Sequence, residues 1–264
     1  MSLPLHSARL KLERAKEHIE SLDELVEDWI ATDAYTVSRE KDTETGYTVC
    51  RAKIKAPPPD QISIVAGDAV QNLRTALDHA VYAMAARAGP VDRATESRLM
   101  FPIAGNENRK GEPADGEALF RNMVANGYLD GVPDRARDFI QQEQPYHWNE
   151  HADGYKYHWL WTVHDLNRID KHRRLTVATA FLDMQFVTTP EGVEPRITFH
   201  RAEGPIKDGD PLVTYAGAEA GVDAHFDRGV ALDEGVAAQH GVQKLLRPVH
   251  DRIEWMLYVL EQAS

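Results

Sequence analysis

Apolar residues recur every three to four positions along three long segments of the chain, which is the period of an amphipathic helix. These segments cover residues 7–31, 61–88 and 233–262. Asp60 can cap the second segment, whose apolar stripe includes Ile64 and Leu73, and Gly89-Pro90 ends it. Pro248 lies inside the third segment and is predicted to kink it. The pattern therefore predicts a long N-terminal helix, a second long helix and a C-terminal helix.

The remaining ordered segments are shorter, and they are of two kinds. Helical spacing predicts three further helices, at about 115–126, 133–142 and 155–173. Residues 35–39 and 47–55 are rich in strand-forming residues and predict a β-hairpin. Beyond Arg174, β-branched and aromatic runs separated by Gly/Pro turns predict an antiparallel β-meander, with strands at 175–189, 196–201, 212–215 and 222–230. The region 95–116 is predicted to be a loop with an anchored apolar segment at 99–103.

Together these segments predict the α+β class: a long N-terminal helix, a β-hairpin, central helices, an antiparallel β-meander and a C-terminal helix. We expect helices to pack on one face of a sheet. A chain of 264 residues can form one larger domain, so we expect a single α+β domain over 1–264. Its helical and hairpin part covers about 1–173, and the meander with the C-terminal helix covers about 174–264.

The net charge of the chain restricts the classes of ligand that it is expected to bind. A formal net charge of −12 argues against a broad basic surface for nucleic acid, and leaves only local basic clusters to bind phosphates. The lone cysteine, Cys50, excludes an intramolecular disulfide and is predicted to be a buried, inert thiol. No segment approaches the roughly 18 apolar residues of a membrane span, and no signal peptide is evident. We therefore expect a cytoplasmic protein that does not enter a membrane.

The second helix carries a polar stripe opposite its apolar one. Residues at intervals of three and four form its main line: Asp68, Asn72, Thr75, His79 and Tyr82. A neighbouring line holds Gln71, Arg74 and Asp78, and the last two can form an ion pair at i,i+4.

The pattern Arg74-x-x-x-x-His79 resembles the Arg-x4-6-His motif of HEPN-type helical domains, many of which are metal-independent ribonucleases. The resemblance implies that Arg74 and His79 are catalytic: they would bind phosphate and assist attack by the 2′-hydroxyl of RNA. Arginine can hold phosphate oxygens bidentately, and histidine exchanges protons near neutral pH. Because five residues on a regular helix separate two side chains by about 140°, the pair needs a distorted turn or a homodimer to meet.

A second polar segment follows Gln144-Pro145-Tyr146 and reads Val163-His164-Asp165-Leu166-Asn167-Arg168-Ile169-Asp170-Lys171-His172-Arg173. With the Asn72-Leu73-Arg74-Thr75-Ala76-Leu77-Asp78-His79 run, it resembles a family of bacterial and phage-borne proteins of unassigned activity. Val163 stands where leucine is usual. The resemblance implies a fold and a defence or mobile-element setting, but no activity.

The predicted site lies between the two polar helices and would serve phosphate or nucleic-acid chemistry without a cofactor. Beside Arg74 and His79, its candidate binding residues are Asn72, Asp78, His164, Asn167, Asp170, Lys171 and His172. In an alternative interpretation the protein is a non-enzymatic binding or assembly protein. The same groups would then lock the helices together, through an Asp170–Arg74 or an Asp78–His172 bridge.

Metal binding through histidines is a third interpretation. His147 and His151 are spaced i,i+4, while His158, Asp165 and His172 share a helix face at intervals of seven. Neither pattern is specific, because the first lacks the Glu of a zincin motif, so we predict no metal. Gly-x-Ser-x-Gly, Gly-x-Gly-x-x-Gly and phosphate-binding Gly-Lys-Ser/Thr patterns are absent from the sequence.

Overall fold

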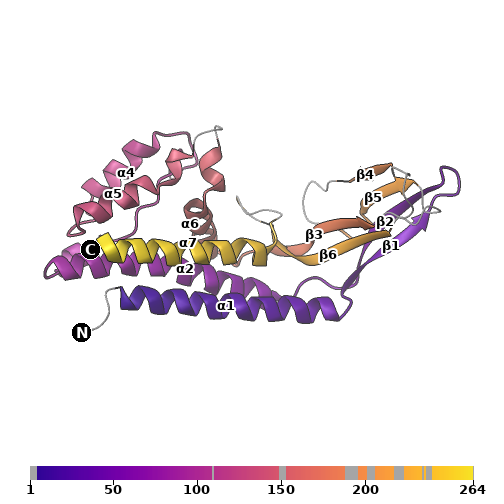
Figure 1. Ribbon diagram of the computed structural model, residues 1–264, viewed down its shortest axis with the longest axis horizontal. Coiled ribbons are helices and arrows are strands. Elements are labelled where there is room, and N and C mark those ends of the chain that lie inside the picture. The colour runs from indigo at the N-terminus through magenta and orange to yellow at the C-terminus, as the bar shows by residue number, and fades with distance from the viewer. Residues whose placement is uncertain are drawn as a thin grey trace. The chain divides into compact units, whose positions relative to one another are not determined.

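The computed structural model describes residues 5–108, 110–148, 153–187, 196–200, 206–216, 223–233, 235 and 240–263 (Figure 1). The α-helices are α1 (His6–Ala31), α2 (Asp60–Ala88), α3 (Arg93–Glu96), α4 (Gly116–Ala125), α5 (Asp134–Gln142), α6 (Trp159–Asp170) and α7 (Val242–Ala263). Two 3-10 turns, η1 (Pro145–His147) and η2 (Gly154–Tyr157), precede α6. None of the described helices is long and apolar enough to cross a bilayer.

The strands are β1 (Tyr35–Lys41), β2 (Tyr47–Ile54), β3 (Val177–Val187), β4 (Ile197–Phe199), β5 (Pro211–Ala216) and β6 (Asp223–Leu232). All of their pairings are antiparallel, and the predicted hairpin is the β1–β2 pair. The α+β class is confirmed.

The strands beyond Arg174 do not follow the order of a meander. β3 pairs with β6, while β5 lies between β2 and β4 in a four-stranded sheet. Cys50 of β2 pairs with Val213 of β5, and both are buried in a cluster with Tyr215. The predicted burial of the Cys50 thiol is thus confirmed. Alternation of apolar residues identifies a strand, but it does not select the neighbour with which the strand pairs.

An element boundary and a core position also differ from prediction. The C-terminal helix begins at Val242 and not near residue 233, because Leu232 N–H donates to His240 O and Ala231 bridges Gly241, which continues the strand pairing. Ile64 is 47% exposed, although we predicted it in the apolar stripe of α2. The neighbouring Ile62 is fully buried and takes the core position there.

The chain divides into two compact units, each assembled from segments distant in sequence. One comprises residues 1–20, 65–174 and 245–264, and the other comprises residues 21–64 and 175–244. The core of the first unit, which we call the helical unit, is built from predicted apolar positions. Leu73 and Leu77 of α2, Leu160 and Leu166 of α6, and Leu257 of α7 are all fully buried.

Candidate functional site

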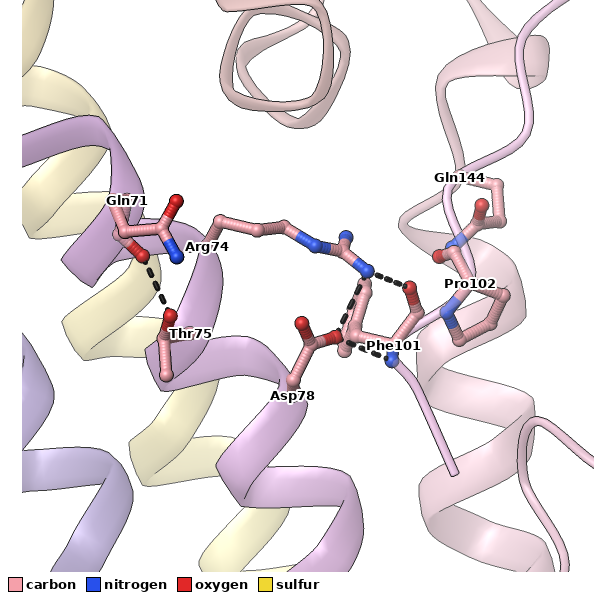
Figure 2. Close-up of polar contacts among 7 residues, drawn as sticks. All are labelled: Gln71, Arg74, Thr75, Asp78, Phe101, Pro102 and Gln144. Carbon is pink, nitrogen blue, oxygen red and sulfur yellow. Dashed lines mark hydrogen bonds and ion pairs between the residues drawn. The ribbon is translucent and has the colours of Figure 1, made fainter. Parts of the chain in front are cut away.

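An ionic clasp joins α2 to the apolar segment that the sequence predicted as an anchor. Arg74 and Asp78 lie one turn apart, and both point from α2 toward Phe101 (Figure 2). Arg74 Nη2 donates to Asp78 Oδ1 at 2.8 Å and to Phe101 O at 2.7 Å. The same Asp78 oxygen accepts the Phe101 N–H at 2.9 Å. The predicted Arg74–Asp78 ion pair is confirmed, and its third member is a backbone peptide.

Gln144 holds the other side of this segment (Figure 2). Its side chain is fully buried, and its Nε2 donates to Pro102 O at 3.1 Å and to Ile140 O at 2.9 Å. Its Oε1 accepts the Ala104 N–H at 2.9 Å. Since a buried amide with these partners has little freedom, Gln144 and the clasp together give residues 101–104 one defined backbone position. The sequence analysis singled out Gln144 only as part of a motif.

A cavity of about 760 Å³ in the helical unit is bordered by this segment, by α6 and by α4. Its lining includes five of the predicted site residues: Arg74, His164, Asn167, Lys171 and His172. We call it the α6 pocket. The structure therefore brings together the polar side of α6 and one residue of α2.

Four predicted site residues are not among those that line the α6 pocket. Asn72 donates to Asp68 O of its own helix, and Asp78 belongs to the clasp. His79 is half-buried, and its Nδ1 has no partner among the described residues. A Cβ at Gly67 would overlap the Asp170 carboxylate, so Asp170 packs against α2 at that glycine.

Asp170 does not form the predicted bridge to Arg74. Burial raises the pKa of Asp170, and the negative charge of Asp68 acts in the same direction. The alternative Asp78–His172 bridge is not formed either within the described part of the chain, because Asp78 pairs with Arg74 while His172 is exposed at the α6 pocket. Arg74 and Asp78 join α2 to the Phe101 peptide instead, a contact that no pairing of side chains could predict.

The lining of the α6 pocket has an excess of positive charge. Among the described lining residues are four cations, Arg74, Lys110, Arg168 and Lys171, and one carboxylate, Glu107. This excess occurs in a chain whose formal net charge is −12. A cationic concave site in an acidic protein favours anionic ligands locally.

Lys110, Arg168 and Glu107 were not predicted as site residues. Arg168 lies on α6, where its Nη2 donates to Asp165 Oδ1 at 2.6 Å while its side chain stays 62% exposed. Lys110 and Glu107 lie in a loop whose two sides are joined by hydrogen bonds. Asn108 N–H donates to Glu112 O, and Ala114 N–H donates to Asn106 O. The sequence analysis quoted Arg168 only as part of a motif and assigned no role to Lys110 or Glu107.

Gly105 is required by a close aromatic contact. A Cβ there would lie 2.5 Å from Tyr155 Cδ2 and 2.6 Å from Trp161 Cζ3. The two rings pack edge to face with centroids 5.0 Å apart. Tyr155 Oη also donates to Glu107 Oε2 at 2.7 Å, and burial together with this hydrogen bond raises the pKa of Tyr155. These contacts hold the start of the loop against α6 and set the wall of the α6 pocket.

His164 is a neutral member of the α6 pocket. Its burial, reinforced by the positive charge of Arg74, lowers its pKa to about 4. Its ring packs on Trp161 with centroids 5.3 Å apart. At neutral pH it therefore offers one donor and one acceptor nitrogen rather than a charge.

Two residues that line the α6 pocket each have a buried polar atom with no hydrogen-bond partner among the described residues: Arg74 Nη1 and Asn167 Oδ1. Arg74 is 7% exposed and Asn167 is 5% exposed. Buried donors and acceptors are almost always paired, because an unpaired one costs about 1–3 kcal/mol. One donor and one acceptor on residues that line one cavity point to a ligand that pairs with both.

The predicted pattern of His158, Asp165 and His172 does not assemble in the described part of the chain, and the His147–His151 pattern lies partly outside it. His158 Nδ1 accepts the Leu160 N–H and caps α6, and burial lowers the pKa of His158 to about 4. His147 Nε2 lies 3.1 Å from Gln141 O, and His151 is outside the described residues. In the described part of the chain, the group with metal-ligand spacing is one that the sequence analysis missed, on α7: His250, Asp251 and Glu254.

Comparison of the chain with protein-family models, with curated proteins and with solved structures gave no match. The function is therefore argued from the geometry of the site.

Proposed function

We propose that the α6 pocket binds a phosphate-bearing ligand. The observation that carries this proposal is the buried Arg74, whose Nη1 has no partner among the described residues and which lines a pocket together with Lys110, Arg168 and Lys171. Guanidinium and ammonium groups form charge-assisted hydrogen bonds with phosphate oxygens, and these are about twice as strong as neutral ones. Arg74 and Arg168 are ion-paired with Asp78 and Asp165, so Lys110 and Lys171 are the cations that exceed the single carboxylate of the lining and favour an anion.

A purely structural role explains only one of the two terminal nitrogens of the Arg74 guanidinium. Nη2 is used by Asp78 and Phe101, and this accounts for the packing of α2 on the anchored segment. Nη1 makes no hydrogen bond in that contact and is buried without a partner in the part of the chain that the structure describes. A residue that served only as a clasp would leave this desolvation uncompensated. Arg74 is thus suited both to position the wall and to meet a ligand.

The test is calorimetric titration of the whole protein with ribose 5-phosphate at low salt. We expect saturable binding, and we expect Lys171→Ala to weaken it about fivefold through the lost Coulomb attraction. Lys16→Ala on α1 is the matched control, since it removes the same charge from the helical unit outside the α6 pocket. Absence of binding, or equal losses in the two variants, would contradict the proposal.

The resemblance to HEPN-type ribonucleases makes RNA one candidate for the ligand. Cleavage by Arg74 together with His79 stays a prediction. Two observations do not favour it: His79 does not line the α6 pocket, and the two residues lie on one continuous helix. A homodimer that brings them together also stays a prediction. If the double variant R74A/H79A cleaved RNA at the same rate as the native protein, this pair would not be the catalytic one.

A further inference from the structure

The α6 pocket has two chemically different zones. The interior is formed by buried groups, which include Arg74, Phe101, Trp161 and Asn167. The rim is formed by exposed cationic or titratable side chains: Lys110, Arg168, Lys171 and His172. A ligand that fills both zones must have an anionic end and a less polar end that carries hydrogen-bonding groups.

The α6 pocket is also larger than a phosphate group alone would fill. Cavities that bind whole small molecules measure roughly 300–1,000 Å³, and the α6 pocket, at about 760 Å³, lies in that range. The walls carry flat or flexible apolar groups, among them Tyr128, Met100 and Met123. Such walls favour a planar ring, because aromatic and thioether groups pack on ring faces and edges.

Asn167 Oδ1 distinguishes between classes of ligand. It is a buried acceptor without a partner among the described residues, so a donor from the ligand would satisfy it. A phosphate dianion has only acceptor oxygens and cannot supply one, whereas a sugar hydroxyl or a nucleobase edge can. The edge of a nucleobase carries donors beside acceptors, so it can give a hydrogen bond to Asn167 and take one from Arg74 Nη1. Neutral His164 adds one more donor or acceptor to this interior without adding charge.

We infer that the ligand of the α6 pocket is a nucleotide, with its base in the interior against Arg74 and Asn167 and its phosphate at the rim near Lys110, Arg168 and Lys171. This inference rests on the proposed function and adds the chemical class of the ligand. It also assigns separate roles to the two zones: the rim supplies affinity for any phosphate, and the interior selects for the base.

The experiment compares ribose 5-phosphate with AMP, CMP, GMP and UMP by calorimetric titration. We expect at least one nucleotide to bind about tenfold more tightly than ribose 5-phosphate, since base packing and edge hydrogen bonds each contribute at about this level. Asn167→Leu should abolish that preference while leaving ribose 5-phosphate affinity within about twofold, because the rim is unchanged. Lys171→Ala should weaken the binding of both compounds by the same factor.

Each outcome has a separate meaning. If ribose 5-phosphate binds and no nucleotide binds more tightly, or if the nucleotide preference survives in Asn167→Leu, the inference is overturned while the proposed function stands. If none of the phosphate compounds binds, the proposed function itself fails. Thermal unfolding verifies that Asn167→Leu folds, and Asn167→Ala is the second variant if it does not. We expect the leucine variant to fold, because it removes an unpaired buried acceptor.

Discussion

Two concave regions of the helical unit differ in how their charges are arranged. A groove of about 430 Å³ between α1 and α7 is lined by three cations, Arg9, Lys16 and Arg247, and by three carboxylates, Glu13, Asp251 and Glu254. The α6 pocket is lined by four cations and one carboxylate among the described residues. The α1/α7 groove has equal numbers of lining cations and carboxylates, whereas cations exceed carboxylates in the α6 pocket even though Arg74 and Arg168 are ion-paired with Asp78 and Asp165. The proposed site therefore differs from the groove by this excess and by buried polar atoms without a partner among the described residues.

The largest expected effect concerns the Arg74 clasp. Arg74→Met should lower the free energy of unfolding by about 3 kcal/mol, because it removes the charge partner of Asp78 and a buried donor to Phe101 O. The same substitution at Arg9, whose ion pair with Glu261 is partly exposed, should cost under about 1 kcal/mol. Urea denaturation of both variants measures the difference. Equal losses would show that the clasp is no more important for stability than a surface ion pair.

A second effect is a pH dependence of the free energy of unfolding, which distinguishes the buried His164 from exposed histidines. Because the folded-state pKa of His164 is lowered to about 4, the unfolded chain binds its proton first as pH falls below about 6.5. The stability associated with neutral His164 is present above pH 6.5 and is lost progressively toward pH 4, by up to about 3 kcal/mol. His164→Gln should remove this part of the acid destabilisation.

Urea denaturation at several pH values between 4 and 7 measures this effect. His172→Gln is the control, because the His172 side chain is exposed and loses little hydration on folding. An unchanged pH dependence in His164→Gln would show that the His164 ring is hydrated in the folded protein.

A smaller effect tests the wall of the α6 pocket. Gly105→Ala should destabilise the protein by about 1–3 kcal/mol, because the new methyl group would overlap the rings of Tyr155 and Trp161. Gly89→Ala is the matched control, since no neighbouring atom lies within 4 Å of a Cβ at that position. Thermal unfolding of the two variants compares them. A Gly105→Ala protein as stable as Gly89→Ala would mean that the loop moves freely from α6.

The smallest expected effect tests whether an excess of cations alone is sufficient to create a phosphate-binding site. The double variant E13Q/E254Q leaves three cations and one carboxylate in the α1/α7 groove, an excess of the same sign as in the α6 pocket. We expect the stoichiometry of ribose 5-phosphate binding to stay at one, because no described residue lining this groove has a buried, unpartnered polar atom. A second binding event in calorimetry would show that the buried donor of Arg74 is unnecessary.

Much of the secondary structure could be predicted because it depends on local spacing. The second helix was predicted at 61–88 and observed as Asp60–Ala88, and its apolar positions Leu73 and Leu77 are fully buried. The Arg74–Asp78 pair was predicted for the same reason, since residues four apart on a helix are neighbours. The site was predicted in part: α6 and the two residues after it supply His164, Asn167, Lys171 and His172 as expected, while Asn72, Asp78, His79 and Asp170 do not line the α6 pocket.

The sequence by itself determined the helices, the strands, the buried stripes and the ion pair within α2, because each depends on residues a few positions apart. Only the tertiary structure decided that β3 pairs with β6, that the Phe101 peptide completes the clasp, and that Lys110 joins the cations of α6. These outcomes depend on which surfaces meet, and on contacts as close as that of Gly105 with two aromatic rings. Periodicity along the chain contains no information about which distant residues come into contact. The α6 pocket could therefore be identified only from the tertiary structure.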